Sequence, residues 1–157
     1  MTCTVGPTCS LSNDSIMGGG YISCGEFMGE DKSGSAISGV LRDMATMLSP
    51  AEAVVFQKHV AGPVLEAMHR GEQEIEIPPA AASLLLGPLA RYHTHLDATL
   101  GHPHPYDAPE LDRKRGMDMT EAKWGEGLGW QFYCTHDLLR ACEVSQKTGA
   151  AIVLHFD

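Results

Sequence analysis

The chain has 157 residues, 43% of them hydrophobic, and its 20 acidic against 11 basic residues give a formal charge of −9. This length predicts one domain, large enough to bury its own core. The acidic balance excludes general binding to nucleic acids or anionic membranes, because both require a basic surface. No segment has the roughly 20 apolar residues of a membrane helix. The N-terminus lacks the charged start and apolar run of a secretory signal, so we expect a cytoplasmic protein.

The N-terminal part of the chain is expected to be irregular as far as residue 34. Residues 1–34 are rich in Gly, Ser, Thr and Asp, which favours turns around one short strand. The clearest helical pattern follows, with apolar side chains at spacings of three and four over residues 37–48. Ser49, Pro50 and Glu52 then match a capping box that starts a second helix.

The middle of the chain continues this helical character. Pro63 is expected to kink or split the second helix, because proline has no N–H to donate. The alternation in residues 74–77 predicts a short strand. A helical pattern over residues 80–86 is expected to stop at Gly87-Pro88.

Two further capping boxes, at Asp107 and Asp118, predict short helices. The C-terminal segment is expected to form a strand at residues 130–133, a helix at 135–147 and a strand at 151–154. That order and size match a βαβ unit with parallel strands. A single strand packed on helices is the alternative.

These elements predict an α+β fold, a predominantly helical single domain over residues 1–157 with a small sheet. Its parts are an irregular, Gly-rich segment (1–34), a helical segment (35–128) and a strand–helix–strand unit (129–157).

A histidine cluster is the least ordinary feature of the sequence. His93, His95, His102 and His104 lie within 12 residues, and Asp97 lies between them. Imidazole and carboxylate groups are ligands of divalent transition metals, so the cluster predicts a metal site, with zinc or iron as the expected ion.

The backbone conformation decides which of these side chains can meet. In a strand, His93, His95 and Asp97 share one face. In a helix, His93 and Asp97 are neighbours and His95 points away, so His102 or His104 has to complete the site. Apolar residues at 89, 92, 96 and 100 favour the helix.

The pattern His93-Thr94-His95 resembles the H-x-H of the JAMM family of zinc isopeptidases. No Ser follows at the spacing of that family's S-x-x-D motif, and the segment has a helical pattern where the family has strands. The sequence is therefore not assigned to the family.

Cys24 is a candidate nucleophile among glycines, because an exposed thiolate there could pair with a histidine. A half-buried structural cysteine is the simpler interpretation. The other cysteines are expected to be reduced thiols.

Two functional hypotheses follow. The first is a small metal-dependent hydrolase of a small-molecule or peptide substrate, in which the ion lowers the pKa of bound water. Glu26 or Asp97 would then accept the proton. The second is a non-catalytic acidic domain that binds a basic protein, as an inhibitor or immunity protein does. The histidine clustering favours the first.

Overall fold

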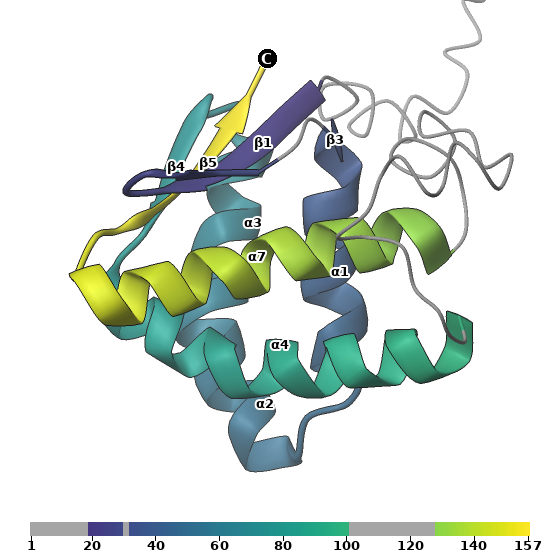
Figure 1. Cartoon of the computed structure of the whole chain (residues 1–157). Helices are drawn as coiled ribbons and strands as arrows, with labels where there is room; N and C mark the ends of the chain where they lie inside the picture. The colour runs from purple at the N-terminus through teal and green to yellow at the C-terminus, as the bar shows by residue number, and fades with distance from the viewer. Residues whose placement is uncertain (1–18, 30–31, 101–127) are drawn as a thin grey trace, which may run out of the picture.

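The computed structural model describes residues 19–29, 32–100 and 128–157. The expected ligands His102 and His104, and the capping boxes at Asp107 and Asp118, lie outside these ranges. In the described residues a small antiparallel sheet packs against a group of helices (Figure 1). The α+β fold with mostly helical content is thus confirmed. None of the described helices is long and apolar enough to cross a membrane.

The sheet contains strands from the two ends of the described chain and from its middle. Its strands are β1 (Gly19–Cys24), β2 (Phe27–Met28), β3 (Lys32–Ser33), β4 (Glu74–Ile77) and β5 (Ile152–Phe156). They are ordered β2-β1-β5-β4, with β3 also pairing with β1, and every pairing is antiparallel. The position of β5 between β1 and β4 leaves β4 at one edge.

The two faces of the sheet differ in burial. Period-two alternation directs one set of side chains toward the helices and the other set away from them. The buried set is Ile22, Cys24, Ile75, Ile77, Ile152 and Leu154. The set on the opposite face is partly or fully exposed and consists of Tyr21, Ser23, Val153, His155, Glu74 and Glu76. The alternation predicted for residues 74–77 is therefore confirmed, and both glutamates point out of the core.

The helices are α1 (Gly34–Ala45), α2 (Pro50–Phe56), a π-helical segment η2 (Gln57–Ala61), α3 (Gly62–His69), α4 (Pro79–Leu100) and α7 (Leu128–Thr148). The two long helices, α4 and α7, lie side by side (Figure 1). Their buried side chains include Leu85, Leu89 and Leu96 of α4, and Leu138 and Cys142 of α7.

Local signals placed two helix boundaries correctly. At the start of α2, the Glu52 N–H donates to Ser49 Oγ and the Ser49 N–H donates to Glu52 Oε1, both at 3.2 Å. The interruption expected at Pro63 is present as the π-helical segment η2. There the Gly62 N–H donates to the Gln57 carbonyl, five residues back. Pro63 consequently falls in the first turn of α3, where the missing N–H does not break an internal hydrogen bond.

The strand expected at residues 130–133 is wrong, because α7 is one continuous helix from Leu128 to Thr148. Phe132, Tyr133, Cys134 and Thr135 are all buried. A helix that is enclosed on most sides has a continuous apolar run, and such a run cannot be distinguished from a strand by periodicity. The parallel βαβ unit is also wrong, since β5 pairs antiparallel with both β1 and β4.

The prediction that a helix ends at Gly87-Pro88 is also wrong. Helix α4 continues through this pair to Leu100. Leu85 and Leu89, on either side of it, are completely buried. Their burial outweighs the one backbone hydrogen bond that Pro88 cannot donate.

Candidate functional site

The described part of the histidine cluster lies in the C-terminal half of α4, so the helical alternative is the one that forms. His93 is half-buried and faces α7, where its Nε2 lies 3.3 Å from Nδ1 of His136. The ring of Phe132 lies beside it, at a centroid distance of 4.7 Å. His95 is exposed, about 200° around the helix from His93 at 100° per residue. The structure therefore does not bring His93 and His95 to one point.

The two predicted general bases lie on different elements. Asp97 is half-buried, one turn after His93 on α4. Glu26 is exposed in the turn between β1 and β2. Across residues 19–29, 32–100 and 128–157, no three His, Cys, Asp or Glu side chains form a group that could hold a metal ion. The metal ligands expected at His102 and His104 lie outside the described residues, so their part in the site stays a prediction.

His136 is the partner that sequence reasoning missed. It lies 43 residues from His93, on another helix. The sequence predicted helix at position 136 and contained no signal for how α4 and α7 align. Their pairing depends on side-chain packing along the whole contact between the two helices.

The thiol alternative finds no support in the geometry of the described cysteines. Cys24, Cys134 and Cys142 are buried in the core. Burial raises the pKa of Cys24 above its ordinary value, and it raises the pKa of Cys142 to about 12. A nucleophilic cysteine needs the opposite shift, because the thiolate is the reactive form.

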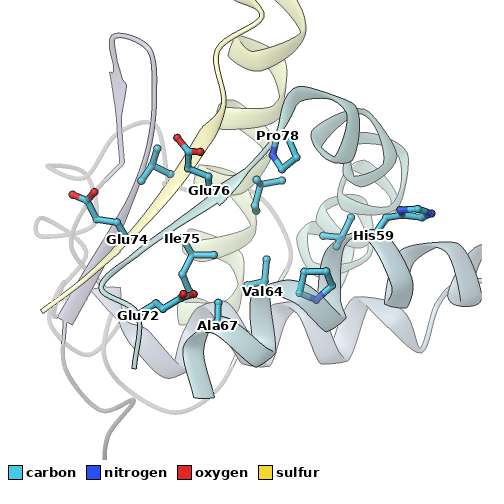
Figure 2. A pocket seen from close by; sticks show the side chains of 12 residues that line it. His59, Val64, Ala67, Glu72, Glu74, Ile75, Glu76 and Pro78 are labelled. Atoms are coloured by element: carbon cyan, nitrogen blue, oxygen red, sulfur yellow. The ribbon is translucent and has the colours of Figure 1, made fainter. Parts of the chain in front are cut away.

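A groove along β4 is a second candidate site, which the sequence did not reveal. It has a volume of about 530 Å³ and lies between β4 and the η2–α3 segment (Figure 2). Val64 and Ala67 of α3 face Ile75 across it, and Pro78 closes one end. Its apolar residues are Val60, Pro63, Val64, Ala67, Ile75, Ile77, Pro78 and Val153.

The polar residues of this groove are almost all acidic. Glu72, Glu74 and Glu76 lie along its β4 side, and His59 lies at the far end, on η2 (Figure 2). No lysine or arginine is among the described residues that line it. The nearby Arg70 forms an ion pair with Glu72, at 3.4 Å. The groove therefore combines an apolar wall with a row of negative charge.

The backbone of β4 also bears on this site, because β4 is the edge strand. The Phe156 N–H donates to the Gln73 carbonyl at 2.8 Å. Backbone groups alternate in direction along an antiparallel ladder, so Ile75 and Ile77 hydrogen-bond toward β5. The N–H and C=O groups of Glu74 and Glu76 then point away from the sheet. No strand of the described chain pairs with this outer side of β4.

Next to the groove, His155 contacts three side chains of the neighbouring strands, those of Tyr21, Ser23 and Glu74. It lies opposite both Tyr21 and Glu74 in the sheet. Its Nε2 is 2.8 Å from Ser23 Oγ, and its Nδ1 is 3.6 Å from Glu74 Oε1. The Tyr21 ring stacks on it at a centroid distance of 4.2 Å. These contacts hold His155 against the sheet, whereas the Glu74 side chain remains 74% exposed.

The described residues thus contain two candidate binding sites. One is the pair of histidines between α4 and α7, and the other is the acidic groove at the edge of the sheet. Comparisons with protein-family models, with curated proteins and with solved structures find no match to this chain.

Proposed function

We propose that this chain is a non-catalytic, acidic binding domain that takes up an extended basic segment of a partner protein along the edge of β4. The observation that carries this proposal is the coincidence of an open sheet edge with an acidic groove that no lysine or arginine lines among the described residues. It corresponds to the second of the two functions that the sequence suggested.

The backbone of the edge strand supplies the first part of the argument. An added strand lies about 4.8 Å from β4 and hydrogen-bonds to the outward groups of Glu74 and Glu76. Exposed edge strands are templates for pairing of this kind. Main-chain hydrogen bonds provide affinity without requiring a particular sequence, so the side chains have to provide the specificity.

The side chains around the edge indicate the sequence of the partner. Alternate residues of an added strand point to opposite faces. Those on the outer face lie beside Glu74 and Glu76, and those on the inner face lie against Val64 and Ala67. The complementary segment therefore alternates Lys or Arg with small apolar residues.

The charge that meets the partner is concentrated at Glu76. Among the described residues Glu76 has no ion-pair partner, whereas Glu74 lies near His155 and Glu72 pairs with Arg70. The formal charge of −9 adds a long-range attraction that raises the association rate of a basic partner. Both effects weaken as salt is added, because the charges are exposed.

A fluorescently labelled peptide of alternating Lys and Val tests this proposal by anisotropy. We expect saturable binding that weakens with salt, and no binding of the matching Glu–Val peptide. The double variant Glu74→Gln/Glu76→Gln is expected to lose at least tenfold in affinity. The control, Glu66→Gln/Glu143→Gln, removes two exposed charges outside the groove and is expected to retain most of the affinity. Equal affinities for the two double variants would contradict the proposal.

The variants Glu76→Pro and Glu76→Gln both remove the charge of Glu76, but only Glu76→Pro also removes its backbone N–H. Comparing them tests whether the peptide binds by strand addition or by charge attraction alone. The Glu76 N–H points away from β5, so Glu76→Pro removes a donor for the partner and leaves the β4–β5 ladder intact. We expect Glu76→Pro to bind the peptide more weakly than Glu76→Gln, with unchanged circular dichroism. If the two folded variants bind equally, the peptide is held by charge alone and the strand-addition mechanism is wrong.

Metal-dependent hydrolysis is the second candidate, and the contact between His93 and His136 favours it. A third ligand from Asp97, His102 or His104 would leave coordination positions open for water. Chromogenic ester, anilide and phosphodiester substrates test this function with and without zinc. Turnover that disappears with a chelator and in His93→Gln supports it, and absence of any metal-dependent turnover contradicts it.

A further inference from the structure

The paired histidines bridge α4 and α7, the two longest helices of the described residues. His93 projects from α4 and His136 from α7, and these helices pack against each other along their length. The Phe132 ring lies 4.7 Å from the His93 ring and 6.2 Å from the His136 ring, measured between centroids. Both imidazoles are therefore half-buried, with one apolar neighbour in common and their ring nitrogens directed at each other.

The separation of these nitrogens is informative. The distance between His93 Nε2 and His136 Nδ1 is 3.3 Å. N–H···O hydrogen bonds measure about 2.7–3.2 Å, and N–H···N hydrogen bonds run slightly longer because nitrogen is larger than oxygen. Two nitrogens that each lie about 2.05 Å from one tetrahedral zinc ion are about 3.3 Å apart. The observed distance therefore fits an N–H···N hydrogen bond in the absence of metal and also equals the spacing of two nitrogen ligands around one ion.

We propose that His93 and His136 bind one divalent transition-metal ion between α4 and α7. A rotation of each ring about its χ2 torsion, which is soft, directs the two lone pairs to a common point. Neutral imidazole selects ions such as zinc, copper and nickel over magnesium and calcium. Water fills the remaining positions, and the Asp97 carboxylate is close enough along α4 to become a third ligand after a change of rotamer.

The location of the ligands has a consequence for stability. His93 and His136 are 43 residues apart in the chain, so only the folded state brings them together. An ion that binds the folded state and not the unfolded state raises the melting temperature by mass action. For a chain of this length the rise is about 5–10 °C at a zinc concentration 100 times the Kd. The inference requires no hydrolytic activity and does not depend on the groove along β4.

Thermal unfolding of the full chain, with and without zinc chloride, tests this inference. We expect the melting temperature of the wild type to rise with zinc and not with magnesium. In His93→Gln and His136→Gln, most of this rise is expected to disappear, and the double variant should lose no more than either single variant. His95→Gln is the matched control, because His95 is an exposed imidazole on the same helix. It is expected to respond to zinc as the wild type does.

A rescue variant distinguishes the loss of a metal ligand from a change in the packing of α4 against α7. His136→Cys replaces one ligand by another that zinc accepts, so it is expected to retain a zinc-dependent rise that His136→Gln lacks. Melting curves without metal show whether each variant folds. The inference is overturned if the wild type does not respond to zinc, or if both single glutamine variants respond as fully as His95→Gln. It is also overturned if His136→Cys responds no more than His136→Gln.

Discussion

Replacement of Gly62 by alanine tests the π-helical segment that accommodates Pro63. A Cβ atom on Gly62 would lie 2.5 Å from the Gln57 carbonyl oxygen and 3.3 Å from Gln57 Nε2. This carbonyl accepts the hydrogen bond from the Gly62 N–H that defines the π turn. The added methyl group therefore meets backbone that cannot move without weakening that hydrogen bond.

Gly87 provides a matched control. Like Gly62, it precedes a proline in helical backbone. Apart from its chain neighbours and the backbone of its own helix within four residues, a Cβ atom on Gly87 would meet nothing within 4 Å. Alanine gains about 1 kcal/mol over glycine inside a helix, and crowding by the following proline offsets part of that gain at both positions. We therefore expect Gly87→Ala to stay within about 1 kcal/mol of the wild type.

The stability lost in Gly62→Ala is best measured relative to Gly87→Ala, because the two sites differ in the room available for a Cβ atom. Overpacking against atoms that cannot yield costs about 1–3 kcal/mol, so Gly62→Ala should be less stable than Gly87→Ala by about that amount. Urea unfolding followed by circular dichroism measures both free energies, and similar m-values confirm that the same surface is exposed in each. Equal stability of the two variants would refute the reasoning, because it would mean that no close contact exists between Gly62 and Gln57.

Two other outcomes are expected. Ser49→Ala removes the side-chain acceptor of the Glu52 N–H and should lower the free energy of unfolding by about 1 kcal/mol, whereas Ser49→Asp, which keeps an acceptor, should cost much less. Failure to see this difference in urea unfolding would argue against the cap. Tyr92 is buried, and burial, followed by the Asp43 carboxylate, raises the pKa of its hydroxyl above the ordinary value of 10.0. Above pH 10 the unfolded chain loses this proton while the folded chain keeps it, so stability falls as the pH rises, by up to about 1.4 kcal/mol per pH unit from this group. The wild type should therefore lose stability more steeply above pH 10 than Tyr92→Phe does, and identical slopes would contradict the shift.

Much of the local structure could be predicted from short-range signals. The capping box at Ser49, the interruption at Pro63 and the alternation in residues 74–77 each involve residues within a few positions of one another. The helical geometry of the histidine segment was also favoured correctly, from the spacing of its apolar residues. In all these cases the deciding interactions are hydrogen bonds or periodic burial along a single element.

Two wrong predictions, a strand at residues 130–133 and a helix end at Gly87-Pro88, both result from long-range packing. Residues 130–133 belong to a helix because neighbouring elements enclose Phe132, Tyr133 and Cys134, and Gly87-Pro88 does not end α4 because Leu85 and Leu89 are buried on either side. In each case burial against distant parts of the chain overrides a local preference. Propensity differences among most residues stay below about 1 kcal/mol, and a proline inside a helix costs about 3 kcal/mol. Burying a large apolar side chain contributes about 1.5–3 kcal/mol, so Leu85 and Leu89 together offset the cost of Pro88.

The sequence by itself determined the class of the fold, the start of α2, the interruption before Pro63 and which face of β4 carries its glutamates. Only the tertiary structure decided that β5 runs antiparallel between β1 and β4, that His93 meets His136, and that α3 forms a groove with the edge of β4. The physical reason is that these arrangements depend on the packing of segments that are far apart in the chain. Periodicity shows which side of an element is buried, but it does not show which element buries it.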